Sequence, residues 1–226
     1  MFKTETHMHT APVSSCGRLS PREMVRLYAE AGYATVFVSD HFAEYHFKKL
    51  GENLPWETLM ELFFGAYEEA KAAGEEYGLR VLLSPELSLH GNHFLIYGAD
   101  RAFFADRPDI FGMTYEEFKA YAAASGATVV QAHPFRDDTF TPHPECADAF
   151  EVVNTNCRHE NYDEKAFALA RELGLPMTAG SDAHQLVDIA GAAMVSEKPI
   201  ESAEEYVKLL MSGQLKLMRH GEILEI

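Results

Sequence analysis

Short apolar runs alternate along this chain with longer stretches in which apolar residues recur every three or four positions. The short runs are typical of buried strands, and the longer periodic stretches are typical of amphipathic helices. The pattern predicts strands at residues 2–7, 34–39, 80–83, 93–97, 127–132, 149–154 and 176–179, the last of which is the final strand. It predicts helices at residues 20–31, 55–77, 114–125, 161–173 and 202–211.

Two of these helices begin with clear capping signals. Ser20 stands at the expected N-cap, Pro21 at the first helical position and Glu23 at the third, which is the pattern of a capping box. Thr114 is followed by acidic residues in the first turn, where they interact favourably with the helix dipole. The sequence therefore predicts helix starts at Ser20 and Thr114.

Strands that alternate with helices indicate a parallel sheet covered by helices. About seven such units predict a closed or nearly closed α/β barrel, in which the functional site lies at the C-terminal ends of the strands. His93 begins its strand instead of following it. We therefore expect that strand to run antiparallel, or to form a hairpin with the segment that contains Glu86.

Composition and charge narrow the class of protein. The 226 residues are 47% hydrophobic, which is typical of one globular domain and not of a disordered chain. Three cysteines are too few for a disulfide framework. No apolar run is long enough for a membrane span, and no signal-peptide pattern is present, so the cytoplasm is the expected compartment. A net charge of −16 disfavours binding to nucleic acid, although metal ions in a cleft can still attract a small anion.

Histidine and acidic residues recur where predicted strands end. His7 and His9 are two residues apart, so a strand would place both rings on one face. Asp40 alone could cap a loop, and Glu86 alone could be a solvated turn residue. Their joint occurrence at strand ends favours a divalent metal cluster, which needs several neutral imidazoles and a carboxylate to bridge two ions. The set comprises His7, His9, Asp40, His41, Glu86, His133, Asp182 and His184.

These segments resemble the PHP (polymerase and histidinol phosphatase) family of metal-dependent phosphoesterases. The matching motifs, in the family's order, are T-H-M-H-T (6–10), V-S-D-H (38–41), S-P-E (84–86), H-F-L-I-Y-G (93–98), Q-A-H-P (131–134) and G-S-D-A-H (180–184). The resemblance implies one distorted (β/α)7 TIM-like barrel over residues 1–226, with up to three divalent ions in its mouth. Their identity, among zinc, manganese and iron, stays open.

The resemblance also implies a role for each residue. It assigns His7, His9 and Asp182 to a first ion, and His93 and His133 to a second. Glu86 would bridge these two ions. His41 and His184 would help to hold a third. Asp40 is expected to orient a neighbouring histidine from behind the ligands. A hydroxide that bridges two ions would attack phosphorus, and the ions would stabilise the developing charge.

One position departs from the family's pattern. Cys16 stands where the family usually has an Asp or His ligand to the third ion. A thiolate there would favour zinc over manganese or magnesium. Alternatively Cys16 is structural and the third site is weak, and we do not count Cys16 among the predicted ligands.

Arginine is the natural bidentate partner of a phosphate. Arg18, Arg136 and Arg158 lie in loops near the motifs, and Arg136 is the best single candidate. Phe42, Tyr45 and Phe47 either line a substrate pocket or pack against the long helix, and residues 42–56 are a candidate lid. The remaining histidines match no motif, so surface or hydrogen-bonded roles are expected for them: His46, His90, His143, His159 and His220.

The leading hypothesis is hydrolysis of a small phosphorylated metabolite, of the histidinol phosphate or nucleotide type that the resemblance implies. A non-catalytic metal-binding regulatory domain is the first alternative, and Cys16 is its best support. Hydrolysis of a C–N bond is the second alternative, because amidohydrolases also carry HxH, His and Asp at barrel strand ends. Glu86 in the bridging position, where such enzymes normally have lysine, favours the phosphoesterase. Nothing in the pattern indicates a particular oligomeric state.

Overall fold

The computed structural model describes residues 1–225. Its helices are α1 (Pro21–Glu30), α2 (Glu44–Leu50), α3 (Trp56–Tyr77), α4 (Arg101–Ala105), α5 (Tyr115–Ala124), α6 (Asp163–Leu173) and α7 (Ala203–Met211). Its strands are β1 (Phe2–Met8), β2 (Thr35–Val38), β3 (His41–Phe42), β4 (Arg80–Leu83), β5 (Glu86–Leu89), β6 (Asn92–Tyr97), β7 (Thr128–Gln131), β8 (Ala149–Asn154), β9 (Met177–Gly180), β10 (Ala192–Ser196), β11 (Lys216–Arg219) and β12 (Glu222–Ile223).

The strands hydrogen-bond in two mixed sheets. One has the order β12-β11-β10-β1-β2-β4 and the other the order β3-β5-β6-β7-β8-β9. Strands β1, β2 and β4 run parallel, as do β7, β8 and β9. The predicted mixed α/β architecture is confirmed. Strand pairing alone does not confirm a closed barrel, because the pairing runs in two sheets.

The two sheets meet at two places. Strands β2 and β4 pair in the first sheet, and their continuations β3 and β5 pair in the second; between them the Glu86 amide donates to the Asp40 carbonyl (3.1 Å). At the other place β9 lies beside β1, where Thr6 Oγ1 donates to the Ala179 carbonyl (2.9 Å). The strand ends that carry the predicted ligands therefore converge from both sheets.

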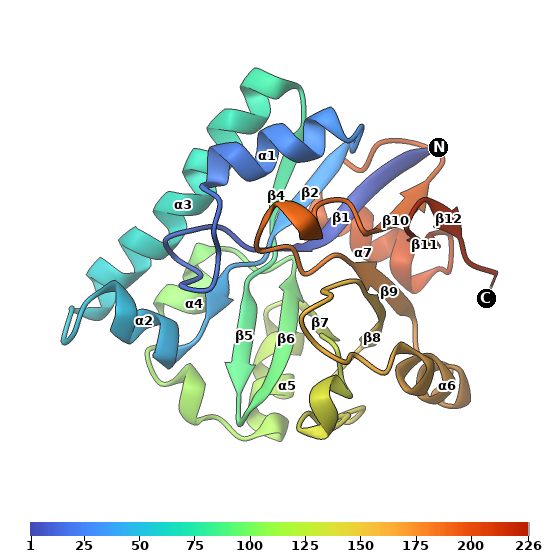
Figure 1. The fold of residues 1–226 in the computed structure, drawn as a ribbon. Coiled ribbons are helices and arrows are strands. Elements are labelled where there is room, and N and C mark those ends of the chain that lie inside the picture. The colour runs from blue at the N-terminus through green and yellow to red at the C-terminus, as the bar shows by residue number, and fades with distance from the viewer. Residues whose placement is uncertain (226) are drawn as a thin grey trace.

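The hairpin expected around His93 is confirmed. Strands β5 and β6 are antiparallel, with Glu86 opposite Leu95 and Ser88 opposite His93. Figure 1 shows this hairpin as the pair of strands that projects at the bottom of the view. The antiparallel turn brings the Glu86 and His93 side chains to the same centre.

The prediction that residues 176–179 form the last strand is wrong. Strands β10, β11 and β12 follow it, and β10 pairs antiparallel with β1. The pattern of alternation missed β10 because only a loop, and no regular helix, separates it from β9.

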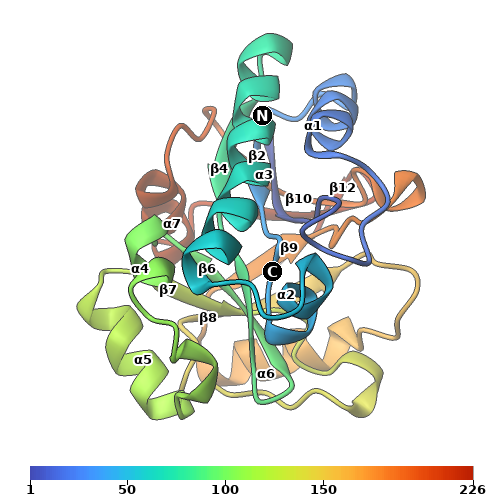
Figure 2. The ribbon, with the colours of Figure 1, turned by 90° about the vertical axis from the view of Figure 1, so that its left-hand side faces the viewer.

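Helices cover the sheets from opposite sides. Helices α1 and α3 lie side by side over the first sheet, and α6 and α7 lie away from them (Figures 1 and 2). The capping boxes at Ser20 and Thr114 are present as predicted. No helix within residues 1–225 combines the length and the apolar character that crossing a membrane requires.

Candidate metal centre

The structure brings together all eight residues predicted as metal ligands: His7, His9, His41, Glu86, His93, His133, Asp182 and His184. They come from the ends of β1 and β9, from β3, β5 and β6, and from the residues after β7. All but His93 are buried, and the His93 side chain is one-fifth exposed. Their assignment to particular ions stays a prediction.

Glu86 lies at the middle of this group. It is fully buried, and its two carboxylate oxygens face five imidazole rings: His7, His9, His41, His93 and His133. The nitrogen–oxygen distances run from 2.5 Å at His41 to 3.7 Å at His9. Burial alone would raise the pKa of Glu86, but the rings of His93, His41 and His7 hold it well below its ordinary value. The carboxyl is therefore ionised, as a bridging ligand must be.

Several buried nitrogen and oxygen atoms of the predicted ligands have no hydrogen-bond partner in the part of the chain that the structure describes. They are His7 Nε2, His9 Nε2, His41 Nδ1 and Glu86 Oε2. An unsatisfied buried polar atom costs about 1–3 kcal/mol, so several in one place indicate a missing partner. Two ligands at about 2.0 Å from one tetrahedral ion stand about 3.3 Å apart. His9 Nε2 lies 3.1 Å from Asp182 Oδ1, and His7 Nε2 lies 3.2 Å from Glu86 Oε1. The donor set therefore fits divalent ions.

Two ligand positions have a strained backbone. His133 and Asp182 have φ angles of 31° and 50°, a region that side chains other than glycine rarely adopt. Such strain persists where the surrounding structure imposes it, commonly at functional sites. From these positions His133 Nε2 reaches Glu86 Oε1 (3.1 Å), and Asp182 Oδ1 reaches His9 Nε2 (3.1 Å).

Asp182 is held by a dense hydrogen-bond network. Its Oδ2 accepts from Arg136 Nη2 (2.5 Å) and from Asn156 Nδ2 (3.2 Å), which leaves Oδ1 facing His9 and His7. Burial opposes ionisation, but Arg136 and His7 outweigh it, and the pKa of Asp182 lies well below its ordinary value. Asp182 is therefore an oriented carboxylate.

Hydrogen bonds at Nδ1 set the tautomers of the first two histidines. His7 Nδ1 donates to Glu151 Oε1 (2.9 Å), so Nε2 turns its lone pair to the centre. Ser14 Oγ donates to Asp40 Oδ1 (2.7 Å) and so accepts from His9 Nδ1 (3.2 Å). Asp40 thus reaches His9 through Ser14, in line with the orienting role expected for it.

The histidines differ in their protonation when no metal is bound. Burial opposes a charge on His7, but Glu151, Asp182 and Glu86 outweigh it and raise the pKa of His7 well above its ordinary value. Burial also opposes a charge on His41, but Glu86 raises its pKa to about 10. Burial and the neighbouring His41 and His184 rings lower the pKa of His9. Metal binding must therefore displace protons, so metal affinity rises with pH.

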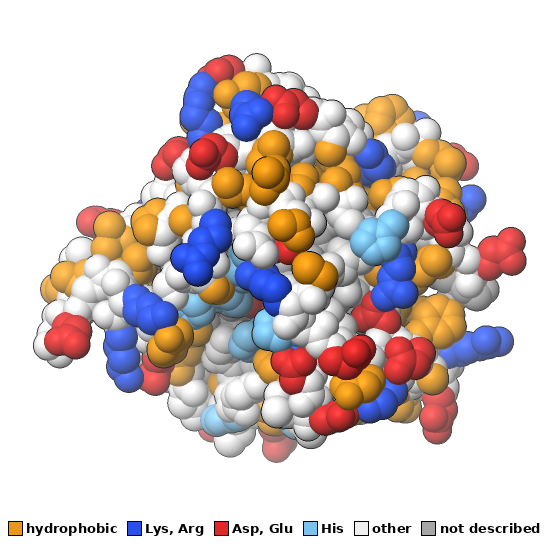
Figure 3. Space-filling model, in the orientation of Figure 1, with side chains coloured by type: hydrophobic (Ala, Val, Ile, Leu, Met, Phe, Trp, Pro, Cys, Tyr) orange, Lys and Arg blue, Asp and Glu red, His pale blue; other side chains and the backbone are white. Residues whose placement is uncertain are grey.

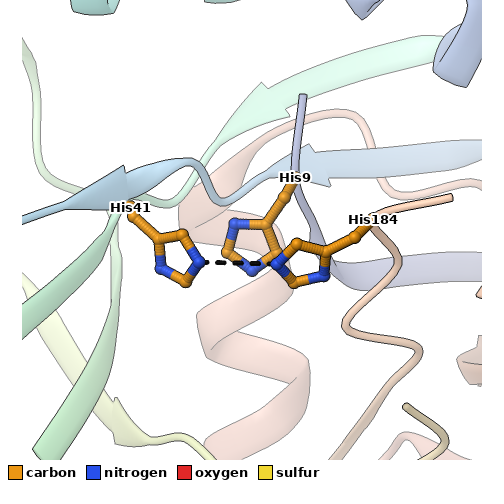
Figure 4. A group of neighbouring side chains, drawn as sticks. All are labelled: His9, His41 and His184. Atoms are coloured by element: carbon orange, nitrogen blue, oxygen red, sulfur yellow. Dashed lines mark hydrogen bonds between the residues drawn. The ribbon is translucent and has the colours of Figure 1, made fainter. Parts of the chain in front are cut away.

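Three histidines lie together at a second part of the centre (Figure 4). His184 Nε2 is 3.4 Å from His41 Nε2. The His9 ring stacks against both, with its centroid 4.2 Å from that of His184 and 4.1 Å from that of His41. The Cys16 sulfur lies within 4.8 Å of a His41 ring nitrogen, and interactions with the His184 and His41 rings outweigh burial and lower the pKa of Cys16 to about 6. A thiol so close to ionisation is a competent metal ligand.

Sequence reasoning missed Ser14, Glu151 and His46. His46 from α2 stacks on His41 at 4.3 Å, and its Nδ1 accepts from the Ser15 amide (3.0 Å). It is hydrogen-bonded as expected, but beside the centre. The signal for Glu151 was its place inside the apolar strand 149–154, where a lone acid needs a buried partner. Ser14 and His46 had no comparable signal.

The three arginines occupy different environments. The Arg136 guanidinium is buried and already paired with Asp182 and Asn161, so it lies behind a ligand. Arg158 contacts Asp188 (3.3 Å) and is one-third exposed. Arg18 is exposed, and its side chain has no ion pair among residues 1–225. Figure 3 shows histidine side chains near the middle of one face, with Lys and Arg side chains beside them.

The aromatic residues after His41 have mixed roles. Phe42 and Phe47 are buried and pack edge-on against Phe63 of α3, at 5.1 and 5.9 Å between ring centroids. Tyr45 is 63% exposed and lies next to His46. The segment 42–56 contains α2, which is anchored by this packing.

A family model matches one part of this chain. Residues 160–215, which include Asp182 and His184, match the model of a family described as PHP-associated. A search of curated proteins finds no match to the sequence.

Solved structures share the fold. A two-domain protein from Bacteroides vulgatus that contains a predicted PHP-like metal-dependent phosphoesterase matches with a TM-score of 0.71 and 19% identity, over 99% of this chain and 66% of that one. A proposed metal-dependent phosphoesterase from Bifidobacterium adolescentis matches with a TM-score of 0.57 and 18% identity, over 92% of this chain and 95% of that one. An amidohydrolase from Chromobacterium violaceum, with bound sulfate and no metal, matches with a TM-score of 0.60 and 15% identity, over 97% of this chain and 98% of that one. At these identities the likeness shows the fold alone.

Proposed function

From the assignment of this chain to the PHP family, which the family model and the neighbouring folds support, we propose that it hydrolyses a small phosphomonoester with bound divalent metal ions. We also infer that its two sheets together form the family's distorted (β/α)7 barrel. The proposal concerns a metabolite-sized phosphate ester, because a net charge of −16 disfavours long polyanions.

The observation that carries the proposal is the environment of Glu86. One buried, ionised carboxylate faces five imidazole rings, and several of the facing nitrogens have no partner among residues 1–225. A carboxylate with two oxygens is suited to join two ions, and imidazole with carboxylate is a donor set for zinc, iron or manganese. When bound, the ions supply an activated water and stabilise charge on phosphoryl oxygens.

The residues divide by the atoms they present. His7 Nε2 lies 3.2 Å from Glu86 Oε1 and 3.5 Å from Asp182 Oδ1. His9 Nε2 lies 3.1 Å from Asp182 Oδ1 and 3.7 Å from the other Glu86 oxygen, Oε2, and we assign these side chains to one ion. His93 Nδ1 and His133 Nε2, each 3.1 Å from Glu86 Oε1, are assigned to a second. The His7 ring is held by Glu151, and the His9 ring is held by Ser14 and, through it, by Asp40. Arg136 holds Asp182.

Arg18 is the proposed phosphate anchor. It is exposed, it has no ion pair in the described part of the chain, and its amide donates to the His184 carbonyl (2.8 Å), which fixes it beside the centre. Arg18→Ala should raise KM for a phosphomonoester and leave kcat and metal content nearly unchanged, because the side chain binds substrate and no metal. Arg26→Ala, at an exposed arginine paired with Glu30, is the matched control. An unchanged KM would remove Arg18 from the site.

The first test of the function is metal content by elemental mass spectrometry, paired with hydrolysis of p-nitrophenyl phosphate with and without manganese. Bound metal and metal-dependent turnover support the proposal. His133→Ala should lower the metal content and lose turnover, whereas His159→Ala, at a histidine partnered with exposed Asp137, should change neither. Metal-loaded protein that turns over neither this substrate nor any member of a metabolite phosphate panel would overturn it.

A further inference from the structure

Cys16 is fixed against the metal centre by its neighbours in the loop between β1 and α1. The Ser15 amide donates to His46 Nδ1 (3.0 Å), and the Arg18 amide donates to the His184 carbonyl (2.8 Å). The backbone on both sides of Cys16 is therefore bonded to elements that carry the centre. The position of its thiol is a property of the folded chain and not of a free loop.

The thiol shares its surroundings with two imidazoles. His41 Nε2 and His184 Nε2 are 3.4 Å apart, close to the separation of about 3.3 Å expected for two nitrogens on one tetrahedral zinc ion. The Cys16 sulfur lies within 4.8 Å of a His41 ring nitrogen, and the His184 ring is the other imidazole that interacts with the thiol. His46 joins this group, but its Nδ1 is already used by Ser15, so it supports the His41 ring by stacking.

A second observation points to a ligand here. His41 is 93% buried, yet its Nδ1 has no hydrogen-bond partner within residues 1–225. That nitrogen stands 2.5 Å from Glu86 Oε2, without the geometry of a hydrogen bond. A divalent cation next to both atoms would take the place of the ring proton and give each of them a partner.

The other two cysteines have different surroundings from Cys16. Cys146 is fully buried in an apolar cluster with residues such as Phe94 and Phe118. Cys157 is exposed. Cys16 differs from both, because it is half-buried and faces imidazole nitrogens.

We propose that the Cys16 thiolate, with His41 and His184, binds a third ion and makes that position selective for zinc over manganese or magnesium. Binding replaces the thiol proton, which leaves to solvent. Thiolate is a soft ligand, which favours zinc and cobalt, whereas the first two positions present only imidazole and carboxylate. The inference rests on the proposed metal centre and is independent of which substrate is cleaved.

Cobalt(II) titration of the metal-free protein tests the proposal without any activity assay. A thiolate–cobalt bond gives a near-ultraviolet charge-transfer absorption that imidazole and carboxylate ligands do not give. We expect this band in the wild type and in Cys157→Ser, the matched control. We expect Cys16→Ser to lose the band and about one cobalt equivalent per chain. Cys16→Asp should regain the equivalent without the band and should bind manganese better than the wild type.

Each outcome decides the matter. A band that persists in Cys16→Ser, or wild-type protein that binds cobalt without a band, would overturn the proposal while leaving the phosphoesterase intact. Failure of the wild type to bind any cobalt would overturn the metal centre as a whole. If Cys16→Ser does not fold, alkylation of the wild type replaces it: zinc should protect Cys16 from iodoacetamide and leave Cys157 reactive, and equal reactivity with and without zinc would refute the ligand role.

Discussion

Replacing Glu151 with Gln changes one atom behind the centre and should weaken metal binding without removing a ligand. Glu151 Oε1 accepts from His7 Nδ1 (2.9 Å), and Oε2 accepts from the His133 amide (3.0 Å) and from Asn154 Nδ2 (2.8 Å). Every partner of this buried carboxylate is a donor. A glutamine amide brings two donor hydrogens of its own, so one of its ends must face a donor in either orientation.

The magnitude follows from those contacts. If the amide nitrogen faces the His133 amide, a buried donor is left unsatisfied, at a cost of about 1–3 kcal/mol in the free energy of unfolding. If it faces His7, the ring must change tautomer and accept at Nδ1. His7 Nε2 then carries the proton and no longer offers a lone pair to the centre. Loss of such an orienting partner typically lowers metal affinity about 10- to 100-fold.

The assay is competition with a chromophoric chelator, read as the zinc dissociation constant of Glu151→Gln and wild type at one pH. Denaturant unfolding of the metal-free proteins separates the stability loss from the affinity loss. Glu145→Gln is the control, because Glu145 is exposed and pairs with His143 away from the ligands. Wild-type affinity together with wild-type stability in Glu151→Gln would refute the reasoning, because one of the two must fall in either orientation of the amide.

Three further predictions concern the metal-free protein and the strand contacts. Glu86 outweighs burial and raises the pKa of His41 to about 10. The protonated ring therefore stabilises the folded metal-free protein fully below the unfolded pKa of about 6.5, and this contribution is lost as the pH rises towards 10. Denaturant unfolding should show the fall in chelator-treated protein and not in metal-loaded protein. Gly180→Ala places a Cβ 2.6 Å from side-chain atoms of β1 and β8 and should cost about 1–3 kcal/mol in thermal unfolding, whereas Gly65→Ala on the open face of α3 should stabilise by about 0.5–1 kcal/mol. Asp40→Asn removes a carboxylate that accepts three buried hydrogen bonds and should lower stability by about 1–3 kcal/mol, measured by denaturant unfolding; a loss below that range would mean that the amide satisfies the same donors.

Most of the elements could be predicted from the sequence because their signals are local. Helix α1 has a capping box, α3 has a long periodic stretch, and parallel strands such as β2 and β8 are short apolar runs. The short helices α2 and α4 and the strands after β9 have no such signal. Their conformation depends on tertiary partners, as β10 depends on β1, and a single sequence does not display those partners.

The candidate site divides in the same way. Seven of the eight predicted ligands stand where predicted strands end, and that pattern implies that they converge. His93 begins its strand and was assigned through the family resemblance. The supporting residues were less accessible. Asn156 and Ser14 matter because they hydrogen-bond Asp182 and Asp40, which are distant from them in sequence. Arg136, on the short 3-10 turn Arg136–Asp138, faces Asp182 instead of solvent. Such contacts depend on geometry that composition and spacing do not encode.

The place of β1 in its sheet has a consequence for how the chain acquires its structure. The strand is made first, but it pairs with β2 on one side and with β10 on the other, near the far end of the chain. Contacts of such long sequence separation slow folding, because the loop must close before the pairing stabilises it. During synthesis β1 therefore keeps one edge unpaired until β10 has left the ribosome, and that interval is when the nascent chain is most open to aggregation.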